Sequence, residues 1–230
     1  MIHQLIFAAP RPGMTEEEFQ QYWLNVHAVR YASKIPQIRK YLIDTRIPFW
    51  PEEGEPLWSG VAEIWLRDEK EQLESLQTPE FLEGARLDEP RWAAFWRTVV
   101  LDTDAHELVP GPDVAPARGV KLIVLAKRRE GLPRAEFRQA SLGGHAALVA
   151  AVPGVRRYLQ CHVRDGAYGI GEAVLDVAHL LWFDDRESMA AALASPEYAK
   201  VQADLETLAE PRYVHRMAVT EHWVIGPEAR

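Results

Sequence analysis

The pattern of apolar and polar positions in the first part of the chain predicts a strand followed by an amphipathic helix. Residues 3–9 form an apolar run, and a segment rich in Pro and Gly at 10–13 ends it. Thr15 and Glu18 have capping-box spacing, so a helix is predicted to begin there and to end before Pro36. One face of this helix carries side chains at steps of four: Phe19, Trp23 and His27.

This pattern occurs twice in the chain. Gly13, Phe19 and His27 reappear 118 positions later as Gly131, Phe137 and His145. The segment from Pro36 to Tyr41 reappears 117 positions later as Pro153 to Tyr158. The repeat is far longer than a solenoid unit, which indicates two duplicated domains. We expect them at 1–109 and 120–230, joined by a proline-rich linker at 110–119.

Each half is predicted to have the order β-α-β-β-α-β, the split unit of ferredoxin-like folds. The strands expected near residues 57–66 and 173–183 are apolar on both faces, so both faces should be covered. We therefore predict an α+β fold in which the antiparallel sheets of two fused ferredoxin-like repeats pack into one intramolecular barrel. Leu73 and Leu76 should form the buried edge of a helix capped by Asp68, and three aromatic residues should be core: Trp92, Phe95 and Trp96.

The residues Glu18-Phe19, Tyr22-Trp23, His27, Pro36 and Tyr41 together resemble the EthD family of the dimeric α/β-barrel superfamily. The resemblance covers essentially the whole chain, once per half. The second copy departs from the pattern, because Ala140 and Ser141 stand where Tyr22 and Trp23 stand in the first. The resemblance implies the fold and a pocket between helices and sheet. It does not fix an activity, since this superfamily hosts cyclases, isomerases, monooxygenases and haem enzymes.

The composition of the chain limits which classes of binding partner are expected. The net charge of −8 disfavours nucleic acid and anionic membranes. A local exception at 127–129 (Lys-Arg-Arg) is either a solvated turn or a clamp for a phosphate or carboxylate. Cys161 is the single cysteine, so an intrachain disulfide is excluded. Without a signal-peptide pattern or a bilayer-length apolar segment, a cytoplasmic protein is expected, a monomer or homodimer that does not need a partner to close its barrel.

The histidines are the candidate catalytic groups. His27 and His145 titrate near neutrality and could move a proton, or each could be a packed histidine bonded to a backbone carbonyl. His179 lies in an apolar strand at the position of Ala62, as a catalytic group or a satisfied core residue. Tyr41 and Tyr158 could polarise a substrate oxygen. The candidate substrate-binding residues are Phe19, Tyr22, Trp23, Asp44, Phe137 and His162. The small Ala140 and Ser141 predict more room beneath the second helix.

Three classes of function fit these residues, and the sequence leaves them open. One is a cofactor-free enzyme that cyclises, isomerises or dehydrates a small hydrophobic oxygenated metabolite. Another is a haem enzyme with one of the histidines as axial ligand. The third is a non-catalytic accessory or carrier protein of an oxygenase pathway. A phosphate loop, a hydrolase elbow and zinc motifs are lacking, and the pairs His106-Glu107 and Glu221-His222 match no metal motif, so no metal is predicted.

Overall fold

The computed structural model describes residues 1–51, 54–169 and 171–228, which divide into two compact units. Unit 1 consists of Met1–Asp102 together with Thr220–Arg230, and unit 2 of Thr103–Val219. The strands β4 (Val99–Val109) and β8 (Ala209–Ile225) each begin in one unit and end in the other. The repeat boundaries expected from the sequence duplication stay a prediction.

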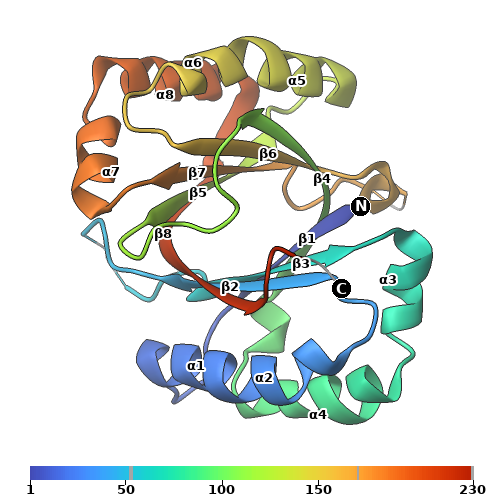
Figure 1. The fold of residues 1–230 in the computed structure, drawn as a ribbon. Helices are drawn as coiled ribbons and strands as arrows, with labels where there is room; N and C mark the ends of the chain where they lie inside the picture. Colours follow the sequence, from blue (N-terminus) through green and yellow to red (C-terminus); the bar gives the residue numbers. More distant parts are fainter. Residues whose placement is uncertain (52–53, 170, 229–230) are drawn as a thin grey trace. The chain divides into compact units, whose positions relative to one another are not determined.

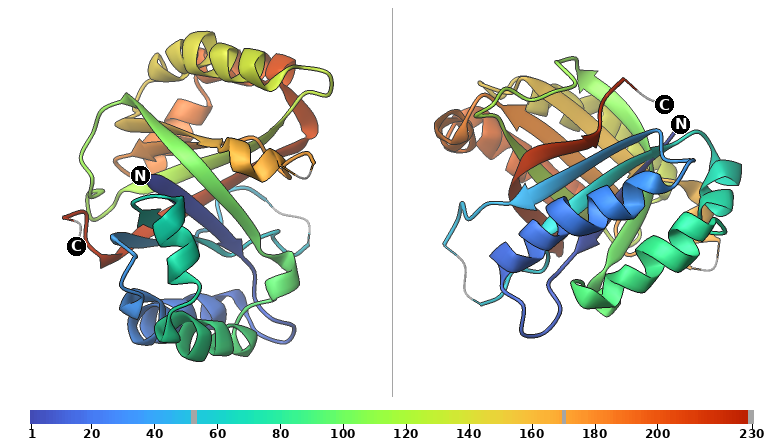
Figure 2. Two further views of the ribbon diagram at one scale, coloured as in Figure 1. Left: turned by 90° about the vertical axis from the view of Figure 1, so that its right-hand side faces the viewer. Right: turned by 60° about the horizontal axis from the view of Figure 1, so that its bottom comes forward.

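Unit 1 places its helices on one face of an antiparallel sheet (Figure 1). In the sheet, β3 (Gly60–Leu66) pairs with β1 (Ile2–Ala8) and with β2 (Lys40–Arg46). The first helical segment comprises α1 (Glu16–Tyr22), a π-helical turn (Trp23–His27), α2 (Ala28–Arg30) and a 3-10 turn (Ala32–Lys34). The later segments are α3 (Glu69–Ser75), a π-helical turn (Glu80–Ala85), α4 (Arg86–Asp88) and 3-10 turns at Glu89–Arg91 and Phe95–Arg97. In Figure 2, α1 and α2 run beside α4.

Unit 2 repeats this arrangement. Its sheet pairs β5 (Val120–Arg128) with β7 (Val177–Phe183) and β8, and pairs β6 (Arg157–Val163) with β7 and β4. Its helices are α5 (Arg134–Ala140), a π-helical turn (Ser141–His145), α6 (Ala146–Ala150), α7 (Arg186–Leu193) and α8 (Pro196–Leu208), with a 3-10 turn at Asp165–Tyr168. The helices α5, α6 and α8 lie together on one side of the sheet (Figure 1).

The strands follow the closed order β1-β3-β2-β8-β5-β7-β6-β4. Within this order each repeat has its last strand next to its first, as ferredoxin-like units do. The predicted fold class, two fused ferredoxin-like repeats forming one antiparallel barrel, is therefore confirmed. Among the helices of the described residues, none is both long enough and apolar enough to cross a bilayer.

The predicted start signals act as caps. The Thr15 hydroxyl accepts a hydrogen bond from the backbone amide of Glu18, whose carboxylate accepts one from the amide of Thr15. This reciprocal pair is the capping box read from the sequence, and it satisfies amides that the first helical turn leaves without partners. Asp68 likewise accepts from the amide of Glu71 and caps α3.

Two core expectations were wrong. Leu73 and Leu76 are 67% and 41% exposed, because α3 turns Glu71 inward, where its carboxylate accepts from Arg39. Trp92 is buried as expected, but Phe95 and Trp96 are 53% and 73% exposed. The helix does not continue to them, since the amide of Ala94 donates to the carbonyl of Ala9, and the 3-10 turn that follows contains no buried residue.

Candidate functional site

A buried histidine–carboxylate pair lies beneath the first helix of unit 1. The π-helical turn Trp23–His27 presents His27, whose Nδ1 lies 3.0 Å from Oδ2 of Asp88 on α4. The other carboxylate oxygen of Asp88 accepts a hydrogen bond of 2.8 Å from the hydroxyl of Tyr22. Both members of the pair are buried. Single π-helical turns inside helices often occur at functional sites, and this one carries the candidate base.

The surroundings of His27 favour the neutral imidazole. Burial lowers the pKa of His27, and the hydrogen bond and charge of Asp88 offset only part of that effect. The neutral ring donates from Nδ1 to the Asp88 carboxylate, which leaves the lone pair on Nε2 to accept a proton. Nε1 of Trp92 also lies 3.2 Å from Nδ1, but a protonated Nδ1 cannot accept from it. We therefore assign this contact to packing, since the two rings lie 4.6 Å apart.

A cavity of about 110 Å³ adjoins this pair, between the helices and the sheet of unit 1. Its walls are mainly aliphatic and aromatic, including Trp23, Ala62 and Trp92, and its polar lining residues include His27, Tyr41 and Glu89. An engineered protein cavity of about 150 Å³ binds benzene, so the space here corresponds to roughly one small ring.

Tyr41 supplies a hydroxyl group to this cavity. Nε1 of Trp23 donates to the Tyr41 oxygen at 3.3 Å. Burial raises the pKa of Tyr41, so the hydroxyl keeps its proton throughout the physiological range. Within the described part of the chain the hydroxyl has no hydrogen-bond acceptor, so its proton can be donated to a ligand oxygen.

Unit 2 contains an equivalent histidine–carboxylate pair. Nδ1 of His145 lies 2.8 Å from Oδ2 of Asp204 on α8, and burial lowers the pKa of His145. Sequence reasoning missed both carboxylates. Asp88 lies ten residues after Thr78, whereas Asp204 lies nine residues after its counterpart Ser195. The first repeat has a π-helical turn at Glu80–Ala85, whereas the corresponding helix of the second repeat, α8, is a regular α-helix. A π-helical turn accommodates one additional residue, which agrees with the longer spacing in the first repeat.

The space beneath the second helix holds a chain of buried polar side chains. Ser141 donates to Gln160 at 2.8 Å, and Gln160 donates to the Tyr158 oxygen at 2.7 Å. The Tyr158 hydroxyl in turn lies 2.8 Å from Nδ1 of His179, whose ring is 5.0 Å from that of His145. Gln160 and His179 thus belong to a hydrogen-bonded chain that includes Ser141, and the expected roomier second pocket stays a prediction.

The remaining candidates take supporting positions. Phe19 packs against Trp23 and Trp92 with ring separations of 5.3 and 5.2 Å. His162 lies 2.9 Å from Gln160 and beside Phe137, and burial lowers the pKa of His162 to about 3. The environment of His162 therefore keeps it neutral, as part of the polar chain of unit 2.

Asp44 does not line the cavity. It is buried on β2, and its carboxylate gathers with those of Glu63 and Glu221, all within 4.8 Å of one another. Such a group has the geometry to hold a cation, and Glu63 also lies 2.6 Å from His3. The structure therefore separates Asp44 from the residues with which the sequence analysis grouped it.

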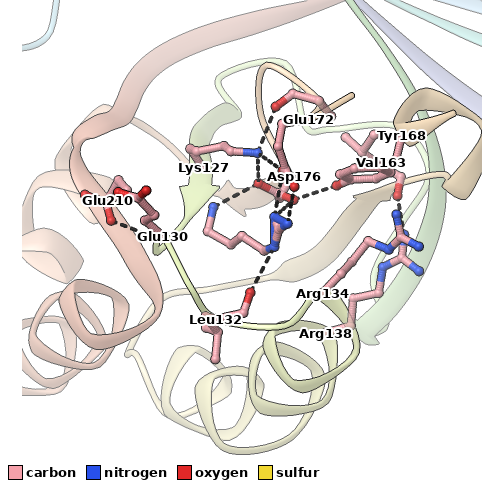
Figure 3. Close-up of polar contacts among 12 residues, drawn as sticks. Lys127, Glu130, Leu132, Arg134, Arg138, Val163, Tyr168, Glu172, Asp176 and Glu210 are labelled. Atoms are coloured by element: carbon pink, nitrogen blue, oxygen red, sulfur yellow. Dashed lines mark hydrogen bonds and ion pairs between the residues drawn. The ribbon is translucent and has the colours of Figure 1, made fainter. Parts of the chain in front are cut away.

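In the basic segment predicted as a turn or a clamp, Lys127 and Arg128 are paired with carboxylates (Figure 3). Lys127 lies 2.8 Å from Glu172 and 2.9 Å from Asp176, and Arg128 pairs with the same two residues. The Tyr168 hydroxyl donates to Asp176 at 2.6 Å. The charges of Lys127 and Arg128 are thus already compensated, which disfavours an anion clamp formed by these two residues.

The comparisons with known proteins agree with the duplicated fold. The EthD domain model matches residues 11–95 and again 129–212. The chain belongs to the EthD family. This EthD protein carries the domain twice, once for each histidine–carboxylate pair. A search of curated proteins found no match.

Solved structures resemble this EthD protein either over its whole length or over half of it. An anthrone oxidase-like protein matches with 13% identity and a TM-score of 0.65, covering 99% of this chain and 94% of its own. An EthD family protein from Bacillus halodurans C-125 matches with 24% identity and a TM-score of 0.38, covering 44% and 95%. SnoaB, a cofactor-independent oxygenase from Streptomyces nogalater, matches with 20% identity and a TM-score of 0.35, covering 45% and 93%.

Proposed function

We propose that this EthD protein catalyses cofactor-independent proton transfer on a small hydrophobic carbonyl compound bound in the unit 1 cavity. One observation carries the proposal: the His27–Asp88 pair leaves an unprotonated imidazole nitrogen beside an apolar cavity that also contains the Tyr41 hydroxyl. A base and a hydrogen-bond donor on one small apolar space are what enolisation requires.

The chemistry uses only side chains of unit 1. His27 removes a proton from the carbon next to the substrate carbonyl, and the electron pair of that C–H bond moves toward the carbonyl oxygen. Tyr41 donates a hydrogen bond to this oxygen as negative charge develops on it, an interaction that apolar walls strengthen. Asp88 orients the imidazole and stabilises the imidazolium. Return of the proton to another carbon completes an isomerisation, and its delivery to a departing hydroxyl completes a dehydration.

The cavity does not fit the haem alternative. Sites for drug-sized ligands measure roughly 300–1,000 Å³, and this cavity of about 110 Å³ lies well below that range. The Nδ1 of His27 is held by Asp88, and the large side chains of Trp23 and Trp92 line this small cavity. We therefore derive no step through haem.

Exchange of carbon-bound hydrogen for deuterium tests the proposal without knowledge of the natural substrate. Small cyclic ketones are incubated with the protein in D₂O, and loss of the α-proton signal is followed by NMR. We expect exchange that His27→Gln abolishes and that Tyr41→Phe slows roughly 10²-fold, as removal of one oxyanion donor does elsewhere. His145→Gln serves as the matched control in unit 2 and should leave the rate unchanged.

Two results would count against the proposal. Exchange that survives His27→Gln removes this residue as the base. Saturable ketone binding without any exchange in the wild-type protein favours the accessory or carrier function instead. Circular dichroism and thermal unfolding of each variant verify that the fold is retained.

A further inference from the structure

We propose that Glu89 is a substrate-recognition residue that accepts a hydrogen bond from a hydroxyl group of the ligand. The ligand class is then a small ring compound with a hydroxyl group as well as a carbonyl. This inference rests on the proposed function only in placing the ligand in the unit 1 cavity, and it concerns recognition rather than proton transfer.

Glu89 is placed next to the histidine–carboxylate pair by the chain itself. It directly follows Asp88 and begins the 3-10 turn Glu89–Arg91. Its side chain lines the same cavity as His27 and Tyr41 and is only 18% exposed. A carboxyl group among mainly apolar walls loses hydration, so it needs a hydrogen-bonding partner to offset that loss.

The protein itself satisfies this carboxyl group incompletely. Its contact within the described residues is with Arg86, whose Nη1 lies 3.4 Å from Oε2, at the outer limit of a hydrogen bond. The Arg86 side chain is half-exposed, and its guanidinium also lies 5.5 Å from the centre of the Phe95 ring. The second oxygen, Oε1, has no hydrogen-bond donor among the described residues, so a ligand can use it.

The electrostatic surroundings of Glu89 support a neutral hydroxyl as the recognised group. Burial raises the pKa of Glu89, Arg86 opposes the shift, and the charge of Asp88 adds to it. Either form of the carboxyl group accepts a hydrogen bond from a hydroxyl. An anionic ligand would instead meet two adjacent acidic residues, so the cavity should discriminate against carboxylates.

These groups define a ligand with two polar ends. Its carbonyl oxygen would meet the Tyr41 hydroxyl, its hydroxyl group would meet Glu89, and the carbon between them would lie within reach of His27. The ring would fill the apolar remainder of the cavity, whose volume of about 110 Å³ accommodates little more than one ring.

Binding of three single-ring probes tests this assignment independently of catalysis. Phenol, toluene and benzoate share a ring but offer a hydroxyl, no polar group and a carboxylate. Their affinities for the full-length protein are measured by ligand-observed NMR titration. We expect wild type to prefer phenol over toluene by about tenfold, the worth of one hydrogen bond to a buried polar group. Benzoate should bind most weakly.

Two variants of Glu89 separate recognition from simple packing. Glu89→Leu should lose the preference for phenol and bind toluene more tightly. Glu89→Gln still accepts a hydrogen bond, so it should keep phenol binding, while its new donor and lower charge admit benzoate. Glu83→Gln, an exposed carboxylate in the preceding π-helical turn, is the matched control and should leave all three affinities unchanged.

An unchanged phenol preference in Glu89→Leu, or a wild-type protein that does not prefer phenol, overturns the inference. Should Glu89→Leu fail to fold, the benzoate affinity of Glu89→Gln decides alone: equal discrimination in wild type and variant is the contrary result. Failure of the proposed function looks different, because the exchange assay then shows no dependence on His27 while the probe preferences still follow Glu89.

Discussion

Ala62 and His179 occupy the same register position in the two units. On β3, Ala62 pairs with Ile6 of β1 and Ile43 of β2. On β7, His179 pairs with the equivalent residues, Val124 of β5 and Gln160 of β6. The alanine methyl borders the unit 1 cavity, whereas the imidazole is buried and bonded to Tyr158. At this position unit 1 therefore has a small side chain beside a cavity, whereas unit 2 has a buried imidazole.

Ala62→His should close the cavity of unit 1. An imidazole at this position would occupy much of a space that holds about one ring, so phenol binding should weaken at least tenfold. The measurement is the same NMR titration used for the ring probes. Ala62→Ser is the control, because it adds a polar atom with little volume and should leave more than half of the affinity. Undiminished binding to Ala62→His would mean that the ligand lies elsewhere.

His179→Ala should open the corresponding space in unit 2 at a cost in stability. The Tyr158 hydroxyl loses one of its two hydrogen-bond partners and a void forms, so we expect the free energy of unfolding to fall by about 2–4 kcal/mol. Free imidazole fits the vacated volume and should restore part of the loss in a urea titration. The exposed His106 provides the control variant, His106→Ala, which imidazole should not stabilise. Equal imidazole effects on both variants would refute a specific filling of this space.

His162 should make the protein sensitive to mild acid. Burial is the main cause that lowers the pKa of His162, to about 3 from the ordinary 6.5. Between these values the unfolded chain binds the proton and the folded chain does not. The stability contribution is therefore present above pH 6.5 and is lost progressively as the pH falls toward 3. At pH 5 the loss amounts to about 2 kcal/mol for this group.

The variant His162→Thr isolates this contribution, because Thr45 stands at the equivalent position of unit 1. Urea unfolding at pH 7.5 and pH 5 gives the free energies of unfolding of both proteins. We expect the wild type to lose about 2 kcal/mol more than the variant over this interval. Identical losses would show that His162 is already protonated in the folded protein at pH 5.

In unit 1 the large Trp23 side chain lies against Gly60. The equivalent positions of unit 2 hold a smaller residue, Ser141, and a larger one, Val177. A Cβ atom at Gly60 would lie 3.0 Å from the Trp23 ring and 2.8 Å from a backbone oxygen. Gly60→Ala should therefore destabilise the protein by about 1–3 kcal/mol. In the background Trp23→Ser the same change should cost about 1 kcal/mol less, as coupled neighbours do. A double-mutant cycle by urea unfolding measures this coupling, and strict additivity would contradict it.

The fold followed from the sequence because the duplication repeats its strongest local signals. The capping box at Thr15 and the strand residues from Tyr41 onward recur at nearly constant shifts, so each half could be interpreted with the help of the other. The histidines became candidates for the same reason, because His27 recurs as His145. Asp88 and Glu89 were not found, because they lie about sixty residues from His27 and the offset of one residue hides the equivalence of Asp88 and Asp204.

Errors arose where tertiary contacts outweigh local pattern. Leu73 fits an apolar helical stripe, yet the ion pair of Glu71 with Arg39 orients the helix the other way. The small Ser141 predicted open space, and the structure places the larger Gln160 side chain within hydrogen-bonding distance of it. Volume at one position therefore predicts a cavity only when the facing residues are known.

Asp88→Asn should lower the pKa of His27 further. Burial already depresses this pKa, and the negative charge of Asp88 is what partly opposes the effect. An asparagine oxygen can still accept from Nδ1, so the ring orientation survives while the imidazolium loses its counter-charge. Nitrogen NMR of the labelled imidazole across pH 4–8 should show a downward shift, and ketone exchange should slow roughly 10²–10⁴-fold. Tyr22→Phe removes only the second hydrogen bond to Asp88 and should produce a much smaller change in both quantities. A His27 pKa that stays at its wild-type value in Asp88→Asn would show that the carboxylate does not stabilise the protonated ring.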